Sequence, residues 1–112
     1  MNEFTNYLNL AIEAAEKKEQ ELIVAERKDE ANLQKIKANI YGICRTVFGV
    51  VYKTSTGEVR KEDYANRLDN ISRNWVESYE KAKQHNDVEK ILIEEIKLDV
   101  IKEVKAYFAA KF

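Results

Sequence analysis

The first 41 residues read MNEFTNYLNLAIEAAEKKEQELIVAERKDEANLQKIKANIY, and they contain neither glycine nor proline. Proline is absent from all 112 residues of the chain. Alanine, glutamate, lysine, leucine and glutamine are common in this stretch, and all five are good helix formers. A segment without helix-breaking residues has few local ways to stop being helical. We therefore expect an all-α protein.

The spacing of apolar residues predicts how far the first helix extends. Apolar residues recur in steps of three and four up to about residue 52, and the alternation is strict from Leu33 to Val50, as in a coiled coil. The register slips by one residue between Asp29 and Leu33. We expect a long helix over about residues 3–52, which is either continuous or broken near residues 28–32.

A turn is predicted at residues 53–60, because Lys53–Gly57 reads KTSTG and is rich in turn-forming residues. A short β-hairpin that pairs residues 47–52 with residues 58–60 is the alternative here, since β-branched and aromatic residues are frequent in this part of the chain. Two further helices are expected at about residues 61–85 and 87–111. Asn86 and Glu89 have the spacing of a capping box at the start of the last one.

These helices predict a single helical domain over residues 1–112, arranged as a three- to four-helix antiparallel bundle. Residues 1–30 either project as an arm or fold back as a fourth helix. No internal repeat is evident from the residue identities. The expected core contains nine large apolar residues from the three later segments: Ile40, Ile43, Val47, Leu68, Ile71, Trp75, Ile96, Val100 and Val104.

Few chemically reactive groups are present. The chain has one histidine, His85, at an expected helix end, and one cysteine, Cys44, in an apolar segment. These cannot supply a nucleophilic triad or a zinc site, and no Glu-x-x-His pair for a di-iron centre occurs. The three glycines do not form a phosphate-binding loop. We expect no catalytic residue, no metal, no cofactor and hence no enzyme.

Two surfaces are candidates for binding macromolecules. An apolar stripe near the N-terminus would be exposed on a projecting arm and could pair with another helix; it consists of Phe4, Leu8, Ile12 and Leu22. The leading hypothesis is therefore a non-enzymatic interaction or adaptor protein that works through helix–helix contacts, as a homodimer or with another helical protein.

The alternative is a small nucleic-acid-binding regulator that uses the basic residues of segment 53–73. The residues in question are Lys53, Arg60, Lys61 and Arg67. The net charge of −1 and the acidic neighbours of this segment make nucleic acid the less favoured partner.

A cytoplasmic location without membrane contact is expected. The start of the chain lacks the basic region of a secretion signal. The longest apolar stretch, residues 40–52, contains Arg45 and is too short to cross a bilayer.

Overall fold

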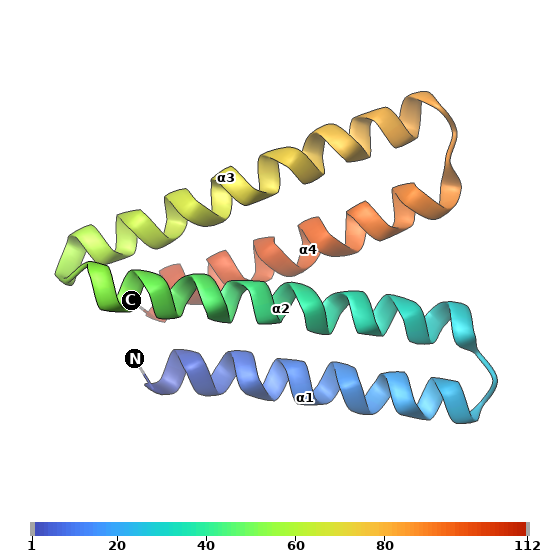
Figure 1. Ribbon diagram of the computed structural model, residues 1–112, viewed down its shortest axis with the longest axis horizontal. Coiled ribbons are helices and arrows are strands. Elements are labelled where there is room, and N and C mark those ends of the chain that lie inside the picture. Colours follow the sequence, from blue (N-terminus) through green and yellow to red (C-terminus); the bar gives the residue numbers. More distant parts are fainter. Residues whose placement is uncertain (1, 112) are drawn as a thin grey trace.

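Four helices make up the computed structural model, which describes residues 2–111 and the side chains of residues 3–111. They are α1 (Asn2–Val24), α2 (Lys28–Thr54), α3 (Gly57–Gln84) and α4 (Val88–Lys111). α1 and α2 form one antiparallel hairpin, and α3 and α4 form a second (Figure 1). The predicted all-α bundle is confirmed, and residues 2–24 fold back as its fourth helix instead of projecting.

The two hairpins converge at one end of the molecule and diverge at the other. The α2–α3 turn lies at the convergent end, whereas the two hairpin turns lie at the divergent end (Figure 1). The largest fully buried side chains come mainly from the convergent half: Phe4, Leu8, Cys44, Val51, Tyr64, Leu68 and Val104. The best-packed part of the core is therefore close to the α2–α3 turn.

One aromatic side chain from each helix meets in this core. Phe4 packs edge-to-face on Phe48 with ring centroids 4.8 Å apart, and Tyr64 packs in the same way on Phe108 at 4.8 Å. The other four edge-to-face contacts all join the hairpins: Phe4 to Phe108 at 5.1 Å, Phe48 to Tyr64 at 5.3 Å, Phe4 to Tyr64 at 5.6 Å and Phe48 to Phe108 at 6.1 Å. Such pairs contribute about 0.5–1.5 kcal/mol each beyond area burial. The cluster therefore holds the two hairpins together.

The first helix ends without a glycine or a proline. Glu26 has a φ of 61°, in the left-handed region. The Glu26 N–H donates to the Ile23 carbonyl at 3.0 Å and the Arg27 N–H to the Leu22 carbonyl at 2.8 Å, which is the Schellman pattern of a helix C-terminus. The continuous helix over residues 3–52 is thus wrong. The break is real but lies at residues 25–27, slightly before the predicted 28–32.

The second hairpin turn has the same backbone form. Asn86 has a φ of 54°, and its neighbour Asp87 accepts a hydrogen bond from the Lys90 N–H through Oδ1 at 3.2 Å. Asp87 is therefore the N-cap of α4, and the predicted capping box with Asn86 as the cap is wrong. Asn86 instead adopts the left-handed conformation, which asparagine tolerates better than most residues.

The α2–α3 turn is shorter than predicted. α2 continues to Thr54, only Ser55 and Thr56 are extended, and α3 starts at Gly57, whose φ is 55°. The alternative β-hairpin over residues 47–60 is wrong, because residues 2–111 contain no strand. Arg60 reaches back to close the end of α2, donating to the carbonyls of Ser55 at 2.9 Å and Tyr52 at 3.1 Å.

The predicted core is confirmed in part. Ile40, Leu68, Val100 and Val104 are buried, whereas Val47, Ile71, Trp75 and Ile96 are only half-buried. Ile43 is 38% exposed, so its assignment to the core is wrong. Trp75 belongs to the second half of α3, which diverges from the other hairpin (Figure 1), and it packs against the core while staying partly exposed.

Candidate functional site

The apolar stripe that was expected to dock a partner lies inside the protein. Phe4 and Leu8 are fully buried, Leu22 is 4% exposed, and Ile12 is half-buried against the same core. Because α1 packs along α2, these four side chains contact the rest of their own chain. Phe4, Leu8 and Leu22 are therefore not exposed to a partner in this fold, and Ile12 keeps only part of its side chain at the surface.

Three of the four predicted nucleic-acid-binding residues have partners within the chain. The Arg60 guanidinium stacks on the Tyr52 ring at 3.9 Å, and Lys61 pairs with Glu58 at 3.4 Å. Arg67 pairs with Asp63 at 3.0 Å, and its hydrogen bond lowers the pKa of the Asp63 carboxyl. Lys53 is exposed on the last turn of α2. The structure therefore does not gather these four residues into one free basic patch.

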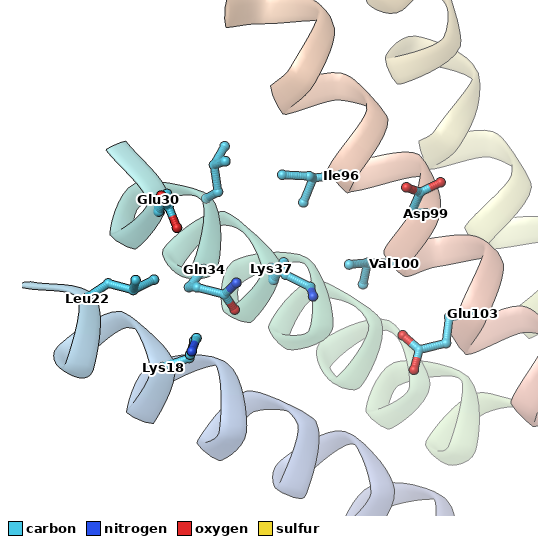
Figure 2. A pocket seen from close by; sticks show the side chains of 10 residues that line it. Lys18, Leu22, Glu30, Gln34, Lys37, Ile96, Asp99, Val100 and Glu103 are labelled. Carbon is cyan, nitrogen blue, oxygen red and sulfur yellow. The ribbon is translucent and has the colours of Figure 1, made fainter. Parts of the chain in front are cut away.

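A polar groove lies between the first hairpin and α4 (Figure 2). Its volume is about 310 Å³. We call it the polar groove and define it by its lining residues, which are Lys18, Leu22, Glu30, Leu33, Gln34, Lys37, Ile96, Asp99, Val100 and Glu103. The divergence of the hairpins leaves this space open, because α4 moves away from the turn between α1 and α2 (Figure 1).

Opposite charges face each other across the polar groove. Lys18 on α1 and Lys37 on α2 lie on one side, and Asp99 and Glu103 of α4 lie on the other (Figure 2). Within residues 3–111, neither lysine has a carboxylate oxygen within 4 Å. Glu30, in contrast, is already paired with Arg27. The groove therefore presents two unpaired ammonium groups next to carboxylates.

A buried tyrosine holds one of these carboxylates in place. Tyr41 is 6% exposed, and its hydroxyl donates a hydrogen bond to the Glu103 carboxylate. Burial, together with the Glu103 carboxylate, raises the pKa of the Tyr41 hydroxyl and also that of Tyr7. Both hydroxyls therefore stay protonated at neutral pH, and that of Tyr41 donates to Glu103. Glu103 is thus oriented from the core, while its carboxylate lines the groove.

No cysteine, serine, threonine or histidine is among the residues that line the groove. Burial raises the pKa of the Cys44 thiol to about 12, so almost no thiolate forms at neutral pH. His85 is exposed in the turn before α4. Among residues 3–111, no three His, Cys, Asp or Glu side chains lie close enough together to hold a metal ion. The arrangement is suited to noncovalent binding of a charged ligand.

A second surface lies on the outer side of the first hairpin. A shallow depression of about 600 Å³ is lined by Ile12 of α1 and by several α2 residues, among them Gly42, Ile43 and Val47. We define the α2 face as these four residues with Gly49 and Val50, which continue it along the helix. A Cβ atom built at Gly42 or at Gly49 would meet no atom within 4 Å, so contacts in the described chain do not require either glycine.

The groove residues were only partly visible in the sequence. Lys18 occupies a position in the helical repeat where an apolar residue is expected, which was the available signal. Glu103 and Tyr41 are 62 residues apart and gave no such signal, because only the antiparallel packing of α2 on α4 brings them together.

Comparison with known proteins adds no relative to this description. No protein-family model, no curated protein and no solved structure matches the chain. Among the described residues, no helix has both the length and the hydropathy of a membrane-spanning segment.

Proposed function

We propose that this is a non-enzymatic interaction protein that acts through helix–helix contacts, and that it forms a homodimer through the α2 face. The observation that carries the proposal is the size of its surface. The accessible surface is 7252 Å², whereas a compact monomer of 13.1 kDa exposes about 6400 Å². The excess is about the 800 Å² that each partner buries in an interface of standard size.

The composition of the α2 face supports a helix as the partner. Ile43 is 38% exposed and Val50 44% exposed, and both lie on the same side of α2 as the two glycines. A glycine inside a helix costs about 1 kcal/mol relative to alanine. Since no contact within the described chain requires Gly42 or Gly49, close approach of a second helix would account for them.

The rim of this surface favours a second copy of the same chain. Glu16 and Arg45 carry opposite charges and line the same depression. In a two-fold symmetric dimer every contact between the two copies occurs twice, with the roles of the two residues exchanged. Glu16 of each copy can therefore face Arg45 of the other. The charges at the rim of the face are therefore self-complementary.

The nucleic-acid alternative has less support. It needs a group of basic side chains that are free to contact phosphates. Arg60, Lys61 and Arg67 all interact with neighbouring groups of the chain, and two of them pair with carboxylates.

Sedimentation equilibrium at about 10–100 µM tests the dimer, since interfaces of this size commonly have dissociation constants in or below this range. Ile43→Glu on the α2 face should give a monomer. Val59→Glu is the matched control, because Val59 is 65% exposed and lies on α3. A wild-type protein that stays monomeric, or equal effects of the two substitutions, would contradict the proposal.

Gly42→Ala separates association from folding. The added methyl group has space in the monomer and improves helix propensity, so the monomer should become more stable by up to about 1 kcal/mol. The same methyl group should weaken the dimer by holding the two α2 helices apart. A variant that is less stable as a monomer would show that Gly42 serves the fold and not the interface.

A further inference from the structure

The two hairpins are structurally equivalent with an offset of 60 residues. Seven pairs of core positions separated by this offset are buried in both members: Phe4/Tyr64, Leu8/Leu68, Leu22/Ala82, Ile40/Val100, Tyr41/Ile101, Cys44/Val104 and Phe48/Phe108. The edge-to-face ring contacts obey the same relation, since Phe4–Phe48 corresponds to Tyr64–Phe108 and both pairs are 4.8 Å apart. The core is thus approximately two-fold symmetric.

The hairpin turns follow the same offset. Glu26 and Asn86 are the two non-glycine residues with positive φ in the described chain. The Arg27 N–H donates to the Leu22 carbonyl at 2.8 Å, and the equivalent bond from Asp87 to Ala82 is 2.9 Å long. Few of the paired residues are identical, so the repeat is present in the structure although it is not evident from the residue identities. Each hairpin can therefore serve as a reference for the other.

This reference shows that the polar groove is specific to one side of the molecule. Lys97 is the equivalent of Lys37, and it is satisfied within the second hairpin by Glu94 at 3.2 Å and by the ring of Trp75 at 5.8 Å. Trp75 stands where the first hairpin has the small residue Ala15. Lys37 in the polar groove has neither partner among the described residues.

The residues on the carboxylate side of the groove also lack charged equivalents in the other half of the molecule. The equivalents of Glu103 and Tyr41 are Ile43 and Ile101, so the hydrogen-bonded pair of the groove is replaced by two aliphatic residues. The groove therefore carries unpaired charges, while the equivalents of Lys37 and Glu103 on the other side are internally paired or apolar. A buried tyrosine that orients a groove carboxylate has no counterpart in the other hairpin.

We propose that the polar groove binds a free α-amino acid with an apolar side chain. Lys18 and Lys37 would bind its carboxylate, and Asp99 and Glu103 its ammonium group. Leu33 and Ile96, which are half-buried, provide apolar surface for the side chain. The volume of about 310 Å³ lies at the lower end of the range of about 300–1000 Å³ for small-molecule sites, which fits a ligand of this size.

Balanced charge is the reason for choosing a zwitterion. After Glu30 is assigned to Arg27, two ammonium groups and two carboxylates remain in the groove. A simple anion would meet Asp99 and Glu103, and a simple cation would meet the two lysines. A ligand with both charges can satisfy both sides at once.

Isothermal titration calorimetry with L-leucine, up to about 10 mM, tests the site over the millimolar-to-micromolar affinity range. L-leucinamide, which lacks the carboxylate, and 4-methylpentanoate, which lacks the ammonium group, should each bind at least about ten-fold more weakly, because each loses a charge-assisted hydrogen bond. Amide chemical-shift changes on adding L-leucine should be concentrated at the groove residues of α1, α2 and α4. Absence of saturable binding, or equal binding of the three compounds, would overturn the proposal.

Lys37→Met and Lys97→Met form a matched pair, since they change equivalent residues of the two hairpins. Lys37→Met should weaken leucine binding about ten-fold or more, and Lys97→Met should change it less than about two-fold. Equal effects would overturn the assignment. Because the groove and the α2 face share none of their defining residues, Ile43→Glu should leave leucine binding unchanged, so the site and the dimer can fail independently.

Discussion

Alkaline pH should unfold this protein by deprotonating groups that are buried in its core. Tyr41 is 6% exposed and Tyr64 is not exposed, and burial is the main cause that raises the pKa of each hydroxyl. In the unfolded chain a tyrosine titrates near pH 10. Below that pH both states keep the proton and stability is unaffected. Above it the unfolded state releases protons that the folded state retains, so stability falls as pH rises.

The size of the effect follows from the number of protons. Each retained proton lowers the free energy of unfolding by about 1.4 kcal/mol per pH unit, and burial raises the pKa of Tyr7 as well, so the three tyrosines together give about 4 kcal/mol per unit above pH 10. Cys44, whose pKa is raised to about 12, adds a similar slope from about pH 9 upward. By pH 12 the combined loss is about 12 kcal/mol, which is comparable to the whole stability of a domain of this size.

The assay follows helix content by circular dichroism and tyrosine ionisation by ultraviolet absorbance over pH 9–13. Part of the tyrosinate signal should appear together with the loss of helix. Tyr64→Phe should remove one of the protons that only the folded state retains. The free energy of unfolding should then fall less steeply with pH, by about 1.4 kcal/mol per pH unit. If all six tyrosines ionise near pH 10 while the helices remain intact, the argument from burial is refuted.

Three further measurements address single residues. Cys44 should react with an aromatic disulfide reagent at pH 8 only as fast as the protein opens, and rapid reaction of the folded protein would contradict its burial. In urea denaturation, Phe4→Ala should lower the free energy of unfolding by about 3–5 kcal/mol, and Trp75→Ala, at a half-buried position, by about 2 kcal/mol. A larger loss for Trp75→Ala than for Phe4→Ala would contradict this ranking by burial. Glu26→Gly should raise stability by about 0.5–1 kcal/mol because Glu26 has a positive φ, with a smaller gain for Asn86→Gly, and a loss at Glu26 in thermal melts would mean that its side chain outweighs the strain.

Helical periodicity was sufficient to predict the type and number of elements but not their ends. The break after α1 occurs at Glu26, a residue that gives no warning of a left-handed conformation. Its cause is tertiary, because folding back buries Phe4 and Leu8 against the other helices. The first residue of α4 was also ambiguous in the sequence. Asn86 and Asp87 are both residue types that cap helix N-termini well, and only the backbone geometry selects Asp87.

Burial was harder to predict where the hairpins diverge. A stripe of apolar residues identifies the inner face of a helix, but it does not state how closely the facing helix approaches. Trp75 lies on that inner face and is still only half-buried. The polar groove arises from the same divergence, so its charges from α1, α2 and α4 could be grouped only once the angle between the hairpins was known.

The equivalence of the two hairpins also has a consequence for the order in which they follow each other along the sequence. Lys111 lies 3.7 Å from Glu3, so the described ends meet close to the α2–α3 turn (Figure 1). A circularly permuted protein, joined between its ends by a short linker and opened at Ser55–Thr56, would present the second hairpin first and keep every helix contact. Most contacts within each hairpin are local in sequence, and local contacts favour rapid folding. We therefore expect the permuted chain to fold to the same structure, with either hairpin able to form first.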